Sequence, residues 1–290
     1  MQTLPFDFAI EDYPLAPLTL YKVGGAAKLA LLPRTLQEAR DAFAWMVAQP
    51  DRHLVLGGGS NVLICDEGFD GNVLITTGLT GIRPLGGDRY DVECGAVLDT
   101  LVREVMIPNN YDLVGGLTGI PGSVGGAIYM NAGTVNGSTC MLMESVEVVG
   151  PAGPQIRPMD GSLYGYRGQT FCPKGHLILG GVFKFSRAEA DQQAIYDHYI
   201  QRRKDTQPKG NCCGSVFKNP PGHHSGRLIE ACGLKGTRYG GAVISEKHAN
   251  FIMNDNNASS ADILWLMAHA KKTVLEVHGV ALEEEVVIIR

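Results

Sequence analysis

The sequence predicts a globular protein of mixed helices and strands, divided into two folding units. Of its 290 residues, 44% are hydrophobic and 19% are charged, which is enough apolar material for sizeable cores and excludes global disorder. The chain opens with a strand–helix–strand pattern and ends with a separate amphipathic helix. Near residue 187 the chain becomes polar, and a Pro/Gly-containing stretch follows at 206–211. We therefore expect one unit at 1–187 and a second at 188–290.

The elements of the first unit are predicted from local patterns. Thr35 and Glu38 have the spacing of a capping box, and apolar residues follow at helical intervals as far as Pro50. Strands are expected on either side of this helix, at 28–32 and 53–56. Further strands are expected at 73–76, 89–94, 146–149, 177–179 and 182–185, with a helix at 98–106.

The second unit is expected to contain one clear helix and a final strand. After a polar, helix-compatible stretch at 187–204, Ser259 or Ser260 is the expected N-cap of a helix that Gly279 ends. Residues 280–289 are predicted to form the last strand. It carries three consecutive Glu residues, and alternation would place Glu283 and Glu285 on one of its faces and Glu284 on the other.

Charge and composition exclude several classes of function. The net charge of −5 and the pI near 5.9 argue against a nucleic-acid binder, which needs a basic face. No apolar run reaches the 18 residues of a membrane span, and the N-terminus lacks the pattern of a secretory signal. The seven cysteines include no C-x-x-C pair, so we expect reduced thiols, a cytoplasmic location and no metal site.

Glycine is abundant, at 37 of 290 residues, and it concentrates in two segments. Residues 57–61 (GGGSN) predict either a tight hairpin or an anion-binding turn whose N–H groups point the same way. Residues 114–133 contain seven glycines, and a short helix starting after Pro121 could face a pyrophosphate. Two such segments in one unit favour a nucleotide cofactor over purely structural turns.

Three further polar segments are candidates for a reactive site. Ser215 follows a glycine, but no G-x-S-x-G pattern surrounds it, so a hydrolase nucleophile is not indicated and a turn serine is the alternative. Arg167 stands among tyrosines and could be a surface charge or a fixed cation over a ligand. Residues 245–250 form a polar rim before an apolar run and show no metal-ligand spacing.

Taken together and in order, eight segments resemble the UDP-N-acetylenolpyruvoylglucosamine reductase (MurB) family, flavoenzymes of bacterial peptidoglycan precursor synthesis. They are KVGG at 22–25, LGGGSNVL at 56–63, TGIPGSVGGAIYMNAG at 118–133, YR at 166–167, GSVFKNP at 214–220, LIEACGLKG at 228–236, GGAVISEKHANFIMN at 240–254 and GVALEEEV at 279–286. The resemblance implies an α+β fold: an FAD-binding domain of the vanillyl-alcohol-oxidase (PCMH) type in two subdomains, about 1–80 and 81–187, followed by an α+β substrate-binding domain.

The resemblance also implies the cofactors. NADPH would supply a hydride, and N5 of reduced FAD would pass it to the enolpyruvyl group of a UDP-sugar. No nucleic acid or membrane partner is implied, and a monomer is expected. FAD would be held noncovalently by Gly57, Gly58, Gly59, Ser60, Asn61, Gly119, Gly122, Ser123, Gly125, Gly126 and Ala127.

Catalytic residues follow from the same resemblance. Hydride addition creates an enolate, which needs a cation for stabilisation and an acid for protonation. Arg167 would be the cation and would bind substrate, and Ser215 would be the proton donor. Glu285 would be the third catalytic residue, acting as an acid or as an orienting group. Lys218 and Asn219 would contact the substrate.

Two departures from the family pattern bear on the site. Ser215 follows Arg167 by only 48 positions, too few for the insertion with a gating Tyr that one family type carries. The shorter type II form is therefore expected. Gln169 stands where a Ser is usual.

Two other functions remain open alternatives. One is an oxidase of small alcohols or sugars from the same flavin superfamily, which the GSVFKNP segment and the terminal L-x-x-E-V pattern oppose. The other is a nucleotide-sugar binding module without catalysis, which the joint presence of Arg167, Ser215 and Glu285 opposes.

Overall fold

The computed structural model describes residues 4–290, which form two compact units. The first contains residues 4–12 together with 28–58 and 70–202, and the second contains 13–27, 59–69 and 203–290. The main division thus lies after Arg202, beyond residue 187, because α5 (Gln192–Thr206) begins on the first unit. There, Gln192 N donates to Asn110 Oδ1 at 3.0 Å, and Asn136 Nδ2 donates to the Tyr199 hydroxyl at 2.8 Å.

A four-stranded sheet carries the start of the chain, in the order β1-β2-β5-β3. β3 and β5 run parallel, with Leu54 opposite Val73. α1 (Leu36–Ala48) begins at the predicted capping box, where Glu38 N donates to Thr35 Oγ1 at 3.1 Å, so this prediction is confirmed. The strands are β1 (Ala9–Pro14), β2 (Ala26–Leu31), β3 (Arg52–Leu56) and β5 (Phe69–Ile75).

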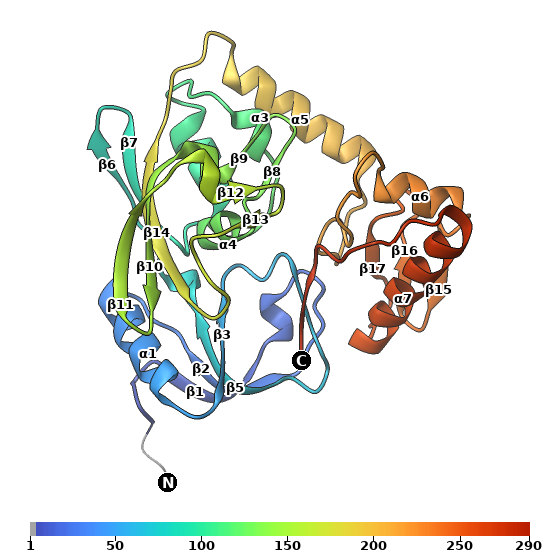
Figure 1. The fold of residues 1–290 in the computed structure, drawn as a ribbon, viewed down its shortest axis with the longest axis horizontal. Helices are drawn as coiled ribbons and strands as arrows, with labels where there is room; N and C mark the ends of the chain where they lie inside the picture. The colour runs from blue at the N-terminus through green and yellow to red at the C-terminus, as the bar shows by residue number, and fades with distance from the viewer. Residues whose placement is uncertain (1–3) are drawn as a thin grey trace. The chain divides into compact units, whose positions relative to one another are not determined.

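A five-stranded antiparallel sheet forms the rest of the first unit, in the order β11-β10-β14-β7-β6 (Figure 1). The two strands expected at 177–179 and 182–185 are one strand, because Gly180 and Gly181 continue the pairing with both β10 and β7. The strands are β6 (Ile82–Gly86), β7 (Arg89–Glu93), β10 (Met143–Gly150), β11 (Gly153–Pro158) and β14 (Leu177–Lys184).

Short helices pack on this sheet through a shared core that includes Val92, Leu101, Val124 and Phe183. The helix expected at 98–106 is confirmed, as α2 (Leu98–Thr100) followed by a π-helical segment at Leu101–Met106. The other elements of the region are α3 (Val114–Leu117), α4 (Val124–Tyr129), β8 (Gly133–Thr134), β9 (Gly137–Ser138), β12 (Tyr164–Gly165) and β13 (Gly168–Gln169), with 3₁₀ turns at Thr76–Gly78, Thr139–Leu142 and Gly161–Leu163. A further 3₁₀ turn, at Ala16–Leu18, belongs to the second unit.

The second unit packs two helices, α6 (Ser225–Ala231) and α7 (Ser260–His278), with a small sheet ordered β15-β16-β17. Its core includes Tyr21, Phe217, Ile263 and Leu266. Ser259 is the N-cap of α7 and Gly279 is its C-cap, as predicted. The strands are β4 (Val62–Ile64), β15 (Arg238–Tyr239), β16 (Ala242–Ile244), β17 (Ile252–Asn254) and β18 (Val287–Ile289).

The structure excludes one of the two alternatives for the glycine turn, and it contradicts the prediction for the last strand. The segment 57–61 is not a hairpin, because β3 pairs with β5 whereas β4 pairs with β18. The last strand covers only Val287–Ile289 instead of 280–289. Residues 283–286 bond instead to the separate segment 216–218, where Lys218 N donates to Glu283 O at 2.9 Å and Glu285 N donates to Val216 O at 2.8 Å.

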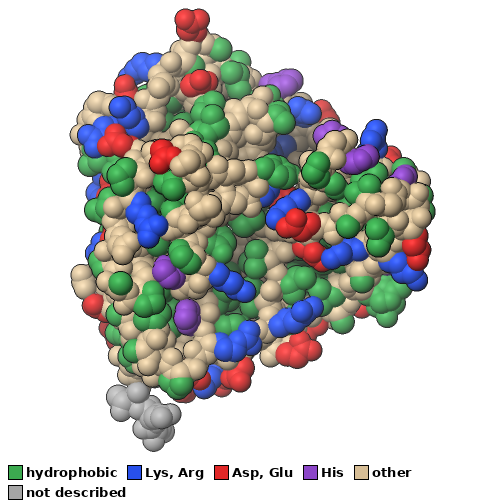
Figure 2. Space-filling view, viewed as in Figure 1, with side chains coloured by type: hydrophobic (Ala, Val, Ile, Leu, Met, Phe, Trp, Pro, Cys, Tyr) green, Lys and Arg blue, Asp and Glu red, His purple; other side chains and the backbone are tan. Residues whose placement is uncertain are grey.

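The surface shown in Figure 2 carries acidic and basic side chains interspersed over the visible face. Among the helices of residues 4–290, none is long and apolar enough to cross a membrane.

The capping box of α7 generates a pH prediction. Asp262 Oδ2 accepts hydrogen bonds from Ser259 N at 3.0 Å and Gly241 N at 3.1 Å, and these bonds, the one from Ser259 first, lower the pKa of Asp262. A carboxylate with a lowered folded-state pKa contributes stability above its unfolded pKa of about 3.9 and loses it as the pH falls through the folded value.

Asp262→Ala should therefore lower the free energy of unfolding by roughly 0.5–1 kcal/mol at pH 7 and by clearly less at pH 3. Urea unfolding of both proteins at the two pH values measures the difference. An equal loss at both pH values would mean that the carboxylate charge does not contribute.

Candidate active site

The two glycine-rich segments meet within the first unit. Gly58 N donates to Ser123 Oγ at 3.1 Å. A Cβ at Gly57 would lie 2.5 Å from Ser123 Oγ, and one at Gly58 would lie 2.9 Å from Gly122 Cα, so both positions require glycine. The structure thus brings Gly57 and Gly58 against Gly122 and Ser123. Ser123 follows Gly58 by 65 positions in the sequence.

The start of α4 does not match one expectation. Val124 N donates to Ala96 O at 2.8 Å, Gly125 N to Cys94 O at 2.7 Å, and Gly126 N to Ser123 Oγ at 3.4 Å. These N–H groups therefore already have protein acceptors, and the idea that they face a pyrophosphate is wrong. The cause is the close approach of the chain after β7, since a Cβ at Gly125 would lie 2.7 Å from Cys94 Cβ.

Gly126 differs from the other glycines of this region. It is exposed, and the nearest atom to a Cβ there would be Ser123 Oγ at 3.6 Å, so the fold leaves room for a methyl group. Glycine inside a helix costs about 1 kcal/mol relative to alanine. Packing within the protein therefore does not explain why a glycine stands at this position. A ligand lying against the helix backbone would explain it. Beside it, Gly119 and Gly122 have φ of +67° and +113°, and Ala127 is buried.

The rest of the GGGSN segment belongs to the second unit. Gly59 has φ of +60°, and its carbonyl accepts from Leu20 N at 3.2 Å, while Ser60 is half-buried. Asn61 bonds to the end of the chain: its Nδ2 donates to Glu285 O at 2.9 Å, and its carbonyl accepts from Val287 N at 3.0 Å. The side chain expected at the cofactor therefore holds the segment that carries Glu285.

Arg167 lies at the tip of a hairpin in the first unit. β12 and β13 pair with Gly165 opposite Gly168, which leaves Tyr166 and Arg167 as the loop. Arg167 has φ of +55°, a left-handed conformation that costs a non-glycine residue about 1 kcal/mol or more. Its guanidinium carbon lies 5.1 Å from the centre of the exposed Tyr166 ring.

Two amide side chains hold this hairpin. Asn131 is buried; its Nδ2 donates to Gly165 O at 2.8 Å, and its Oδ1 accepts from Cys140 N at 3.1 Å. Gln169 Nε2 donates to Cys172 O at 2.8 Å, and Gln169 Oε1 accepts from Cys172 N at 2.7 Å. Gln169 therefore has a structural role in place of the expected Ser. Asn131 lies in the glycine-rich segment 118–133, but no local sequence pattern predicts that its side chain holds this hairpin.

In the second unit, Ser215 and Glu285 lie on neighbouring backbone segments. Glu285 N and Val286 N both donate to Val216 O, at 2.8 and 3.3 Å. Ser215 is half-buried, so part of this residue is accessible to a ligand. The structure therefore places these two predicted residues close along paired backbone.

The predicted substrate contacts are on the same segment. Lys218 Nζ lies 2.5 Å from Glu283 Oε1, and Asn219 Oδ1 accepts from Ser225 N at 3.1 Å at the start of α6. The thiols that precede Ser215 are buried: burial raises the pKa of Cys213 to about 12, and burial also raises that of Cys212. These cysteines stay protonated near neutral pH, so a thiolate nucleophile is not indicated.

Asn250 belongs to the polar rim at 245–250, for which the sequence predicted no partner within the chain. It is 3% exposed and bonds to both ends of the Phe217 backbone: Phe217 N donates to Asn250 Oδ1 at 3.0 Å, and Asn250 Nδ2 donates to Phe217 O at 2.8 Å. The only available signal was its place in a polar rim before an apolar strand, which does not reveal a partner more than thirty positions away.

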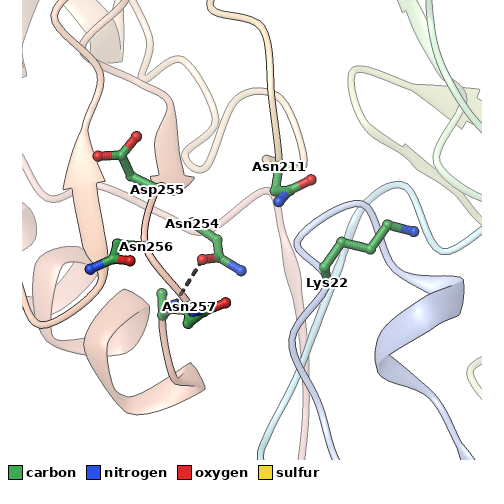
Figure 3. Close-up of a pocket in the computed structure, with 7 residues that line it drawn as sticks. Lys22, Asn211, Asn254, Asp255, Asn256 and Asn257 are labelled. Atoms are coloured by element: carbon green, nitrogen blue, oxygen red, sulfur yellow. Dashed lines mark hydrogen bonds between the residues drawn. The ribbon is translucent and has the colours of Figure 1, made fainter.

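A separate polar depression of about 350 Å³ lies in the second unit (Figure 3). In it, Asn254 Oδ1 accepts from Ala258 N at 2.8 Å. No residue predicted for the site lines it; its lining includes Lys22, Asn211, Asn254, Asp255, Asn256 and Asn257.

Comparison with known proteins identifies the family. A model described as an FAD binding domain matches residues 27–157, and one described as the C-terminal domain of UDP-N-acetylenolpyruvoylglucosamine reductase matches residues 206–289. The reductase of Caldicellulosiruptor bescii is 34% identical over 97% of this chain and 90% of its own length. That of Levilactobacillus brevis is 38% identical, covering 97% and 92%.

A solved structure agrees with these relatives. The crystal structure of the reductase (MurB) from Thermus caldophilus has a TM-score of 0.80 and 32% identity, and it covers 97% of this chain and 98% of that chain. Similarity of this extent, in sequence and in fold, spans both units. The α+β fold is confirmed, and the chain belongs to the UDP-N-acetylenolpyruvoylglucosamine reductase family of FAD-dependent oxidoreductases.

Proposed function

We propose that this protein reduces the enolpyruvyl group of UDP-N-acetylglucosamine enolpyruvate to give UDP-N-acetylmuramate, with NADPH as the hydride donor. Family membership supports a reductase acting on a UDP-sugar in peptidoglycan precursor synthesis. The observation that carries the finer proposal is the position of Ser215, a half-buried serine next to Val216, whose carbonyl accepts from the backbone N–H of Glu285. An enolate intermediate requires a proton donor, and a hydroxyl at this position can supply one.

The glycine segments fit a bound flavin nucleotide. The open face at Gly126 would accept a ligand against the helix backbone, and Gly57, Gly58 and Gly122 form a wall without side chains beside it. Ser123, Gly119, Gly125 and Ala127 shape this wall. Gly59, Ser60 and Asn61, which follow Gly58 directly in the chain, are further proposed contacts. FAD bound there would supply the hydride from N5.

Ser215 would protonate the substrate carbon after hydride addition. A serine hydroxyl is a weak acid, so its role depends on a strongly basic carbanion beside it. Glu285 would assist as an acid or by orienting the hydroxyl. Lys218 and Asn219 would bind the anionic substrate, with Lys218 exchanging its partner Glu283 for a substrate oxygen.

Arg167 would stabilise the enolate. A left-handed loop position suits glycine or asparagine, so an arginine there is retained at a conformational cost. The planar guanidinium can donate two parallel hydrogen bonds to a carboxylate, which a lysine cannot do. The backbone strain therefore favours a functional side chain over a surface charge. We further propose a cytoplasmic monomer.

The flavin proposal predicts opposite effects of one substitution on stability and binding. Gly126→Ala should leave the apoprotein as stable or raise its free energy of unfolding by up to about 1 kcal/mol. It should also weaken FAD binding, because the added methyl group occupies the face proposed for the cofactor. Fluorescence titration of apoprotein with FAD and urea unfolding of the apoprotein measure the two effects, and acid precipitation should release FAD from the wild type. Unchanged FAD affinity would remove Gly126 from the cofactor site.

Ser215→Ala should separate the two half-reactions. Flavin bleaching by NADPH should keep its rate, because this step needs no protonation of substrate carbon. Return of the flavin colour on adding the enolpyruvyl substrate should slow by about 10²–10⁴-fold, and Ser215→Cys should retain partial activity. Stopped-flow absorbance follows both steps. Equal slowing of both, or of neither, would exclude Ser215 as the proton donor.

Arg167→Lys should preserve the fold, since lysine keeps the charge and the same backbone demand. The rate of flavin reoxidation by substrate should nevertheless fall by about 10²–10³-fold, because the paired donors are lost. In Arg167→Ala this rate should fall by at least the same factor. Thermal unfolding and FAD content serve as controls. Near-normal reoxidation in Arg167→Lys would show that only a point charge is needed.

A further inference from the structure

We propose that Asn250 is a positioning residue for the reaction: its side chain and carbonyl fix the Ser215–Val216 peptide so that the Ser215 hydroxyl is aimed at the substrate carbon. This inference rests on the proposed role of Ser215. It assigns Asn250 no contact with substrate or cofactor.

The first support is the set of hydrogen bonds that Asn250 makes. Its carbonyl accepts from Val216 N at 2.9 Å, and its side chain bonds to both the N–H and the C=O of Phe217, at 3.0 and 2.8 Å. The amide therefore pairs with Phe217 as a neighbouring strand would. Because Val216 N belongs to the peptide that follows Ser215, Asn250 fixes the backbone directly next to the proton donor.

The second support is that Val216 is held from both sides. Its N–H goes to Asn250, and its carbonyl accepts from Glu285 N at 2.8 Å. One residue thus links the Asn250 loop to the Glu285 segment. Displacing Asn250 would move the proton donor relative to Glu285, and misplacement of a reacting group by 1 Å can cost about 10²-fold in rate.

The third support is the difference between the two sides of Ser215. Gly214 precedes it with φ of +85°, and no heavy atom lies within 4 Å of where its Cβ would be. A glycine by itself constrains the backbone little. On the C-terminal side, by contrast, the bond from Val216 N to Asn250 O holds the peptide that directly follows Ser215.

The loop that presents Asn250 is itself braced. Ser245 Oγ accepts from Lys247 N at 3.1 Å, Ser245 N donates to Phe251 O at 2.8 Å, and Asn250 N donates to His248 Nδ1 at 3.2 Å. Burial, followed by the charge of Lys235, lowers the pKa of His248, so the ring stays neutral near pH 7 and can accept this bond. A rigid loop can transmit a defined geometry to its partner.

Asn250→Ala tests the proposal through the two half-reactions. Flavin reduction by NADPH should change by less than about 2-fold, and reoxidation by the enolpyruvyl substrate should slow by about 10–100-fold. The matched control is Asn254→Ala, which also removes two side-chain bonds to backbone in the same unit, to Tyr21 O and from Ala258 N, and should leave both steps unchanged. Slowing of both steps alike, or the same result in the control, would overturn the proposal.

Asn250→Asp adds a test that remains valid if the alanine variant unfolds. A buried carboxyl has a raised pKa. When protonated, it can both donate to Phe217 O and accept from Phe217 N, as asparagine does; when ionised, it cannot donate. Reoxidation by this variant, relative to the wild type, should therefore recover as the pH falls from 8.5 to 6.5. A ratio that stays constant over this range would contradict a positioning role.

A double substitution separates this proposal from the proposed function. If Asn250 acts through Ser215, adding Asn250→Ala to Ser215→Ala should slow reoxidation by less than about 2-fold more. Full multiplication of the two effects would overturn the positioning role alone. If Ser215→Ala itself leaves reoxidation unchanged, the proposed proton donor is wrong, whereas normal reoxidation in Asn250→Ala with a slow Ser215→Ala refutes only the present inference.

Discussion

The parallel pairing of β18 with β4 is the constraint on which the site of the second unit depends. β4 follows the GGGSN turn directly, and β18 is the last strand of the chain, so the pairing joins segments more than two hundred positions apart. It leaves Glu285 two residues before β18, where its carbonyl is fixed by Asn61 and its N–H by Val216. A shift of one residue in this register would reverse the side on which each Glu lies.

Amide side chains hold each of the segments that carry a proposed catalytic residue. Asn61 holds the Glu285 segment, Asn131 and Gln169 hold the Arg167 hairpin, and Asn250 holds the Ser215 segment. Asparagine and glutamine carry both a donor and an acceptor, so one side chain can satisfy the backbone that a missing strand would leave unpaired. Irregular loops thereby gain fixed geometry without losing the exposure that binding requires.

Local sequence patterns correctly predicted those helix ends that are determined by residues close together in the chain. The Thr35–Glu38 capping box, the α7 cap at Ser259 and the stop at Gly279 are confirmed because each depends on residues within one turn. The prediction of the final strand was wrong, and local patterns could not exclude a hairpin at 57–61, because the pairing partners of these strands lie far away in the sequence. The same limit applies to the site: Arg167, Ser215 and Glu285 were recognisable as motifs, whereas Asn250 is identifiable only once its contact with Phe217 is seen.

The burial of the thiols bears on how such an enzyme tolerates its own chemistry. A reduced flavin that reacts with oxygen releases hydrogen peroxide beside the protein, and peroxide oxidises thiolates far faster than thiols. Burial raises the pKa of Cys94 and Cys213 to about 12, and that of Cys172 to about 11, so these groups remain in the unreactive form at neutral pH. We therefore expect these buried thiols to react slowly with peroxide.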